Sequence, residues 1–258
     1  MKSLRLLLPF AVLLGTFTPV AARAADEGTW SVTPAFSSQY LFRGARLADA
    51  SFQPSLDYSR GAFAAGVWSS AALSGQAQGR PDLELDFYGM YSFSNDARTV
   101  EFAPGFWLYT YPDTDDNDRH PSLTFEPNLA VNFYVAGIRL TPALYYDVTR
   151  EGATWEIAAA FALPLKQLGT TIEFLATAGT FKWDNITRDA SPQTKNWGDY
   201  YTVGARIPVT IGARSQIALG LTHSLGRNNF FKQGTAPKHR NPAAGHHTAV
   251  TLSYTFWP

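Results

Sequence analysis

The chain has 258 residues, of which 45% are hydrophobic, so it can form one large domain or two small ones. Its 21 basic and 21 acidic residues give a formal net charge of zero, which removes any global electrostatic support for nucleic-acid binding. It contains no cysteine, and this excludes disulfide scaffolds, cysteine-ligated zinc sites and thiol catalysis.

The first segment has the composition of an export signal. Two basic residues precede an apolar run at 6–14, and a motif of small residues ends at Ala24. A membrane-spanning helix needs about 20 apolar residues, so this run is too short to anchor the chain. We therefore predict a cleaved signal peptide at residues 1–24 and one exported domain at residues 25–258, without a transmembrane helix.

The stretch 82–93 alternates polar with apolar residues. Successive side chains of a β-strand point to opposite faces, so this stretch predicts a strand with one acidic, wet face and one apolar face. The acidic face carries Asp82, Glu84, Asp86 and Tyr88, and the apolar face carries Leu83, Leu85, Phe87, Tyr91 and Phe93. One such strand also fits a soluble β-sandwich, so the fold depends on how often the pattern recurs.

The same alternation recurs along the chain in about twelve segments of roughly 9–13 residues, the length that a tilted membrane strand requires. Short connections near Gly61, Asn95, Ala136, Gln167 and Gly212 alternate with longer ones, the two longest at 184–198 and 226–247. No segment has a helical period that could cover the apolar faces, so lipid is the expected partner. We therefore predict an all-β fold, a transmembrane antiparallel up-and-down β-barrel of about 12 strands in the cell outer membrane.

The charged residues determine which face of each strand is the inner one. A charge on the lipid face costs up to about 2–4 kcal/mol, and a register shift of one residue would turn a whole set of carboxylates toward lipid. The charged residues at alternate positions of each strand are therefore expected to point inward. These predicted pore-lining residues are Arg43, Asp57, Glu84, Asp86, Glu101, Glu126, Arg139, Asp147, Glu156, Glu173 and Arg206. A secreted sandwich with two inner apolar faces is the alternative fold.

Two groups of residues test the barrel prediction. A proline removes a donor from the strand ladder, and a closed barrel has no edge strand, so prolines are expected at bulges or strand ends. The prolines in predicted strands are Pro34, Pro54, Pro104, Pro127, Pro142 and Pro208. Aromatic residues at strand ends are expected to form girdles at the membrane interfaces, and these are Trp30, Tyr40, Phe93, Phe133, Tyr146, Trp155 and Phe256.

Four segments in the first half of the predicted mature chain resemble a known family. They are 38–44 (Ser-Gln-Tyr-Leu-Phe-Arg-Gly), 53–58, 83–89 (Leu-Glu-Leu-Asp-Phe-Tyr-Gly) and 108–112 (Leu-Tyr-Thr-Tyr-Pro). Their succession is similar to that of the TorF-type porin family, in which a Tyr-x-Phe-Arg-Gly segment closes the first strand and an acidic strand follows. Residues 45–49 depart from that pattern. The resemblance implies an outer-membrane barrel and no particular substrate.

The predicted inner face indicates a function. Carboxylates outnumber arginines on it, and rings of carboxylates favour cations. A barrel of about twelve strands lies between the eight that side chains fill and the sixteen that leave a wide channel. We therefore predict a porin-like channel for passive diffusion of small hydrophilic solutes or ions, with a weak preference for cations. Two alternatives stay open: a lumen filled by ion pairs, and a non-conducting structural or adhesive barrel that acts through its long external loops.

Catalysis and metal binding have less support from the sequence. An outer-membrane lipid hydrolase would need a nucleophile and a base on one face, whereas His223 and Ser224 are strand neighbours that point to opposite faces. An enzyme would require His223 to meet a nucleophile from a neighbouring strand. The acidic run 113–118 lacks the glycine and the glutamate of a calcium loop, and His246 and His247 fit a polar loop. We predict no enzymatic activity, no metal and no cofactor.

The expected partners are outer-membrane lipids, lipopolysaccharide and small hydrophilic solutes, with no nucleic acid. Basic residues gather at the long-loop end, where they can pair with lipopolysaccharide phosphates or keep the loops soluble. They include Arg46, Arg80, Arg119, Arg150, Lys182, Arg188, Lys195, Arg227, Lys232, Lys238 and Arg240. No interface signal sets the oligomeric state, and a barrel of this size can be a monomer.

Overall fold

The computed structural model describes residues 28–76, 82–95, 97, 99–114, 121–184, 196–227 and 243–258. The predicted signal peptide lies outside these residues, as do most of the acidic run at 113–118 and His239. Within the described residues, no helix is long and apolar enough to cross a membrane.

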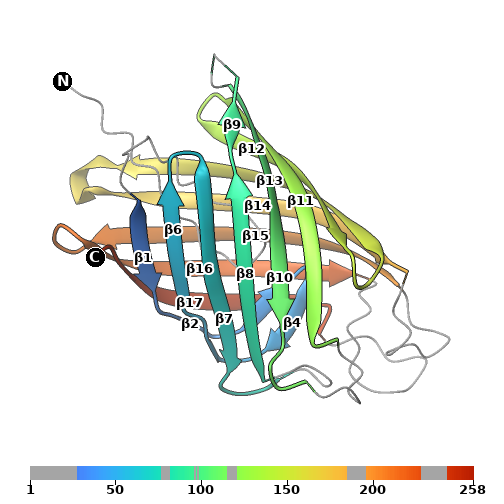
Figure 1. The fold of residues 1–258 in the computed structure, drawn as a ribbon. Helices are drawn as coiled ribbons and strands as arrows, with labels where there is room; N and C mark the ends of the chain where they lie inside the picture. The colour runs from blue at the N-terminus through green and yellow to red at the C-terminus, as the bar shows by residue number, and fades with distance from the viewer. Residues whose placement is uncertain are drawn as a thin grey trace.

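The strands form one antiparallel sheet that closes into a barrel (Figure 1). Its segments are β1 (Thr29–Thr33), β2 (Ala35–Ser37), β5 (Ser51–Phe52), β6 (Ser55–Arg60), β7 (Phe63–Ala72), β8 (Leu83–Tyr91), β9 (Phe93–Ser94), β10 (Val100–Thr110), β11 (Leu123–Val135), β12 (Ile138–Asp147), β13 (Gly152–Leu165), β14 (Thr170–Trp183), β15 (Trp197–Thr210), β16 (Ser215–Arg227) and β17 (His246–Phe256). The last strand closes the barrel by pairing with the first, at Phe256 with Val32 and at Leu252 with Phe36.

The segments make a barrel of 12 strands, because β1–β2, β5–β6 and β8–β9 are each one strand with a break. Short turns connect the strands at the end of the barrel that also carries Phe256, including the 3₁₀ turn η1 (Lys166–Leu168) and the Ala136–Gly137 turn. Both residues of that second turn have positive φ, 50° and 82°, as a two-residue hairpin of type I′ requires. The predicted fold class, strand count and alternation of connections are therefore confirmed.

The prolines lie where the ladder is interrupted, as a closed barrel requires. Pro34 separates β1 from β2, and Pro54 separates β5 from β6. The remaining four lie inside strands, each at a gap or an end of the pairing with one neighbour: Pro104, Pro127, Pro142 and Pro208. Pro142, for example, falls in the gap of the β11–β12 ladder between the pairs Ala130–Ala143 and Phe133–Leu140.

The two faces of the wall have opposite chemistry, and the apolar one is outside. Trp155 is 60% exposed and Val203 56% exposed on the outer face, whereas Glu126 on the inner face is 1% exposed. A water-soluble protein buries its large apolar side chains, so this inverted arrangement is that of a barrel surrounded by lipid. Of the predicted girdle residues, all except Tyr40 are exposed on the outer face.

Tyr40 was predicted to lie in an aromatic girdle at the membrane interface, and this prediction is wrong. The chain leaves the wall after Ser37 and forms a separate hairpin, β3 (Tyr40–Phe42) and β4 (Ala45–Ala48), inside the barrel. Figure 1 shows β4 behind the front wall of β8 and β10. The turn residues Arg43 and Gly44 have φ of 44° and 78°, so they form another type I′ turn that reverses the chain.

Candidate functional site in the barrel lumen

The tip of the β3–β4 hairpin is joined to the wall by an ion pair. The Arg43 guanidinium donates one hydrogen bond to each carboxylate oxygen of Glu126 on β11, at 2.8 and 2.7 Å. Arg43 is 5% exposed and its Cζ lies 5.3 Å from the centre of the Tyr145 ring on β12. Bidentate geometry makes this the strong form of an arginine–carboxylate pair, and the cation–π contact adds to it. The hairpin is therefore fixed to the β11–β12 side of the lumen.

The charge of Arg43 is stable in this site. Burial by itself lowers the pKa of the guanidinium, but the carboxylate of Glu126 and the ring of Tyr109 more than offset this effect and hold the pKa above its ordinary value. The arginine therefore remains charged at every pH at which the barrel is folded in a cell.

The same hairpin packs closely against the opposite wall. A Cβ added to Gly226 on β16 would lie 2.1 Å from the carbonyl oxygen of Gly44, so the two backbones touch. The backbone N–H of Arg46 donates to the carbonyl of Ala243 at 2.7 Å, and Ala45 forms a β-bridge with Ala244. The hairpin thus reaches from β11 to β16 across the lumen.

Tyrosine hydroxyls surround the hairpin and donate to the inner carboxylates. Glu84 on β8 accepts from Tyr40 at 2.8 Å and from Tyr111 at 3.2 Å. Glu156 on β13 accepts from Tyr200 at 2.7 Å. Hydrogen bonds from neutral donors satisfy buried carboxylates without cancelling their charge. These hydrogen bonds hold the carboxylates of Glu84 and Glu156 beside the hairpin.

Nearer the short turns, polar residues of the inner face form hydrogen bonds between neighbouring strands. Arg206 on β15 donates to Glu173 on β14 at 3.0 Å and to Gln216 on β16 at 3.2 Å. Glu101 on β10 accepts from the Asn132 amide on β11 at 2.8 Å. These contacts link neighbouring strands across the barrel wall, and Arg206 compensates the charge of Glu173.

The structure places every predicted pore-lining residue on the inner side of the barrel. All except Arg43 lie on wall strands, and Arg43 lies on the hairpin and not at the end of the first strand. Eight of these residues are buried: Arg43, Glu84, Asp86, Glu126, Asp147, Glu156, Glu173 and Arg206. Asp57, Glu101 and Arg139 are half-buried. Carboxylates outnumber arginines in the set by eight to three.

Some of the basic residues at the long-loop end are held by internal ion pairs. Arg150 pairs with Asp147 at 2.9 Å and lies over the ring of Trp183, and Arg46 pairs with Asp49. Such pairs reduce the charge that these two residues present at the long-loop end of the barrel.

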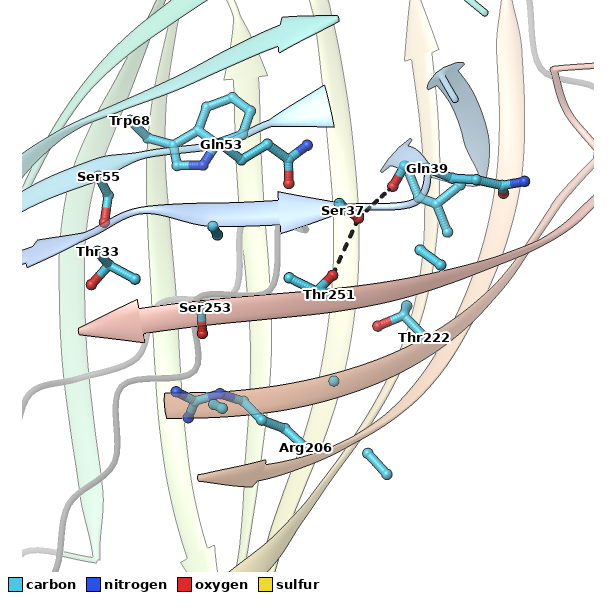
Figure 2. Close-up of a pocket in the computed structure, with 16 residues that line it drawn as sticks. Thr33, Ser37, Gln39, Gln53, Ser55, Trp68, Arg206, Thr222, Thr251 and Ser253 are labelled. Carbon is cyan, nitrogen blue, oxygen red and sulfur yellow. Dashed lines mark hydrogen bonds between the residues drawn. The ribbon is translucent and has the colours of Figure 1, made fainter. Parts of the chain in front are cut away.

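A cavity of about 70 Å³ lies on the short-turn side of the hairpin (Figure 2). Six neighbouring strands of the wall line it, in the order β7, β6, β1–β2, β17, β16 and β15, while Leu41 of the hairpin covers one end. Among the described residues that line it, Arg206 alone is charged. The other polar residues that line it carry hydroxyls or carboxamides.

His223 and His246 lie on the outer face of the barrel and not in the lumen. His223 points outward from β16, where its Nδ1 lies 2.9 Å from the hydroxyl of Thr248 and its Nε2 3.4 Å from Nδ1 of His246. Ser224 points inward and bonds the Thr202 hydroxyl at 2.9 Å, so the predicted opposite orientation of His223 and Ser224 is confirmed. Among the residues that the structure describes, no group of three potential metal ligands occurs.

The sequence pattern did not reveal the hairpin because its alternation continues that of the first strand. The available signal was the Arg43–Gly44 pair between two short apolar runs, since a glycine at such a position favours a tight hairpin turn. Residues such as Tyr109, Tyr111, Tyr145 and Tyr200, which face the hairpin, became identifiable only once its position was known.

A family model described as a bacterial protein of unknown function (Gcw_chp) matches residues 21–180. The chain belongs to this family. The Gcw_chp match includes the segments that resemble TorF-type porins, and the TorF assignment itself stays a prediction. Comparison with curated protein sequences gives no match.

Solved outer-membrane barrels share the fold of this Gcw_chp protein. The structure titled KdgM porin in complex with disordered oligogalacturonate has a TM-score of 0.53 and 8% identity over 88% of this chain and 98% of that chain. The NanC porin has a TM-score of 0.53 and 11% identity over 88% and 98%. The COG4313 outer membrane channel from Pseudomonas putida F1 has a TM-score of 0.49 and 10% identity over 90% and 95%. The similarities to KdgM and NanC establish the fold of outer-membrane porins.

Proposed function

We propose that this protein is an outer-membrane channel through which small hydrophilic solutes and ions diffuse passively, with a weak preference for cations. The observation that carries the proposal is the closed barrel with an apolar outer face and a polar, charged inner face. A structural barrel needs the apolar outer face, and a water-filled or solute-binding lumen gives a reason for the polar, charged inner face.

The charges of the inner face support the cation preference. The predicted pore-lining residues include eight carboxylates and only three arginines, and two of these arginines, Arg43 and Arg206, pair with Glu126 and Glu173. Anions are repelled by uncompensated negative charge at short range, where salt screens little. The oligogalacturonate with which the KdgM porin is in complex is a polyanion, and an inner face on which carboxylates outnumber arginines does not suit such a solute.

The orientation follows from the connections. Barrels of this class have short periplasmic turns and longer external loops, so we place both ends of the barrel chain and the short-turn end in the periplasm. The β3–β4 hairpin is then a folded-in external loop, and lipopolysaccharide surrounds the outer end of the wall. Because the sheet closes on itself, the barrel has no open edge and can act as a monomer.

The packing of the hairpin favours a second candidate, a non-conducting barrel that acts through its external loops. Tyr40, Ala45, Leu47 and Ala48 form a buried cluster with Trp68 of β7, so the hairpin fills a large part of the lumen at its level. A hairpin that stays in this position at all times would leave no continuous path for ions.

Single-channel recording separates the two candidates. The refolded protein without residues 1–24 is inserted into a planar bilayer, and the reversal potential is measured in a gradient of potassium chloride. Stable current steps with a cation-biased reversal potential are the expected result. A barrel that is shown to be folded by its heat-modifiable migration on gels, yet gives no current steps, would favour the non-conducting candidate.

A further inference from the structure

We infer that the cavity beside the β3–β4 hairpin is a binding site for a small, neutral, polyhydroxylated solute, of the size of erythritol or a pentose. The inference rests on the proposed channel function and specifies the class of solute that the channel carries. It follows from the chemistry of the cavity lining, which differs from that of the rest of the lumen.

The cavity lining is rich in hydroxyl groups, which come from neighbouring strands of one curved stretch of the wall. Hydroxyls line it at Thr33, Ser37, Ser55, Thr222, Thr251 and Ser253. Thr33, Ser37 and Ser55 already donate to Thr255, Gln39 and Asp57, so they offer acceptor lone pairs, whereas the hydroxyls of Thr222 and Ser253 can both donate and accept, as can each hydroxyl of a polyol. Figure 2 shows Ser37 and Thr251 side by side on the paired strands β2 and β17, joined by a hydrogen bond. A solute in this concave part of the wall can exchange hydrogen bonds with several strands at once.

The cavity offers little to an ion. Its single charged residue, Arg206, directs one terminal nitrogen at Glu173 and the other at Gln216, so its charge is already compensated. An ion that left water for this cavity would lose hydration without meeting an opposite charge, which is costly. A neutral polar solute does not pay that cost, because hydroxyl groups replace its water contacts.

Two further residues indicate a ligand. The Oε1 atom of Gln39 is buried and accepts no hydrogen bond from the described residues, so it is an acceptor for a hydroxyl of a solute. Trp68 lines the same cavity, held by an aromatic contact with Tyr40 of the hairpin at 5.7 Å between ring centroids. An apolar ring beside hydroxyl groups suits a molecule with both C–H and O–H surfaces.

The size of the cavity sets the size of the solute. A volume of about 70 Å³ holds about five water molecules at 10–15 Å³ each. The cavity is open beside Gly220 on β16, because a Cβ there would meet no atom closer than 3.8 Å. A small polyol fits this space, while an oligosaccharide would require the hairpin to move.

The test uses the channel in planar bilayers with erythritol or ribose added to potassium chloride, and the fraction of current blocked is measured. Both polyols are expected to reduce the current. Thr222→Val removes one hydroxyl without changing the size of the side chain, and Trp68→Leu removes the ring. Loss of one hydrogen bond is expected to weaken the block about two- to tenfold.

Two controls test whether the block depends on the hydroxyls of the cavity and of the solute. Thr177→Val makes the same substitution on the inner face of β14, outside the cavity lining, and is expected to leave the polyol block unchanged. Tetramethylammonium, a cation without hydroxyl groups, is expected to block wild type and Thr222→Val equally. Conductance without polyol block, or polyol block that Thr222→Val and Trp68→Leu leave unaltered, would overturn the inference while the channel proposal stands. An absence of conductance in the folded wild-type barrel would instead overturn the channel proposal.

Discussion

Arg43 and Glu126 hold the hairpin across the lumen through two parallel hydrogen bonds of 2.8 and 2.7 Å between almost fully buried groups. The residues are far apart in the sequence, and their pairing converts an external loop into part of the barrel interior. A buried ion pair contributes little net stability compared with apolar packing, but breaking one partner leaves an uncompensated charge. The pair therefore fixes the position of the hairpin more than it stabilises the fold.

Glu126→Gln is expected to loosen the hairpin and to increase the mean conductance and its fluctuations. The substitution removes the partner charge of Arg43 in a buried site, and such a change costs about 3–5 kcal/mol. Single-channel recording measures the conductance and its fluctuations, and urea unfolding in detergent or lipid vesicles measures the loss of stability. Unchanged conductance together with a large loss of stability would show that the hairpin does not limit the path.

Two further variants separate the effect of the hairpin's position on conductance from the effect of a general loss of stability. In Arg43→Met/Glu126→Met, apolar side chains replace both charges, so stability is expected to recover while the specific position of the hairpin is lost. Lys182→Ala breaks an exposed ion pair with Asp184, of 3.2 Å, and is expected to change stability by less than about 1 kcal/mol and conductance not at all.

Gly226→Ala is expected to displace the tip of the hairpin by steric contact alone. The added Cβ would lie 2.1 Å from the Gly44 carbonyl oxygen, and Gly226 does not have a positive φ, so backbone strain plays no part. The matched control is Gly245→Ala, which lies next to Gly226 through a backbone hydrogen bond and where an added Cβ meets its nearest atom at 3.7 Å. A change of single-channel conductance in Gly226→Ala and none in Gly245→Ala is the expected outcome; equal behaviour would contradict the close packing of hairpin and wall.

The sequence predicted the wall of this barrel well because a membrane barrel imposes a strict rule on each strand. One charge on the lipid face is costly, so residues such as Glu84 and Asp86 identify the inner face without any knowledge of neighbours. The sequence also predicted the type of position that the prolines occupy, since residues such as Pro34 and Pro142 can be placed only at breaks of a ladder.

The lumen contents were not predictable by the same rule. Tyr40 and Phe42 continue the alternation of the first strand, and parity alone cannot tell a membrane face from a hairpin face. The contact of Arg43 with Glu126 depends on tertiary structure, because it joins an external loop to a strand on another part of the wall. The same holds for the cavity, whose lining combines both ends of the chain.

Neutralising the carboxylates that accept hydrogen bonds from tyrosine hydroxyls is expected to lower the preference for cations. Glu84→Gln and Glu156→Gln keep acceptors for the tyrosine hydroxyls of Tyr40 and Tyr200 while removing one charge each. The ratio of cation to anion permeability, from the reversal potential, is expected to fall toward one, and further in the double variant. Glu151→Gln, in an exposed turn at the long-loop end, is the control and should leave the ratio unchanged. A ratio that does not respond to the double variant would show that ions follow a path away from these carboxylates.

Leu219→Arg tests whether the outer face is surrounded by lipid. Leu219 is 55% exposed in the middle of β16, and an arginine on the lipid face costs about 2–4 kcal/mol near the bilayer midplane. Leu168→Arg makes the same change in the short turn η1, where the cost falls to about 0–1 kcal/mol because the side chain reaches water. Both variants are refolded into vesicles, and their free energies of unfolding are compared in urea. A water-soluble barrel would tolerate both substitutions equally, because an exposed arginine in water carries no desolvation cost; only a lipid-covered wall makes the central substitution the more costly one.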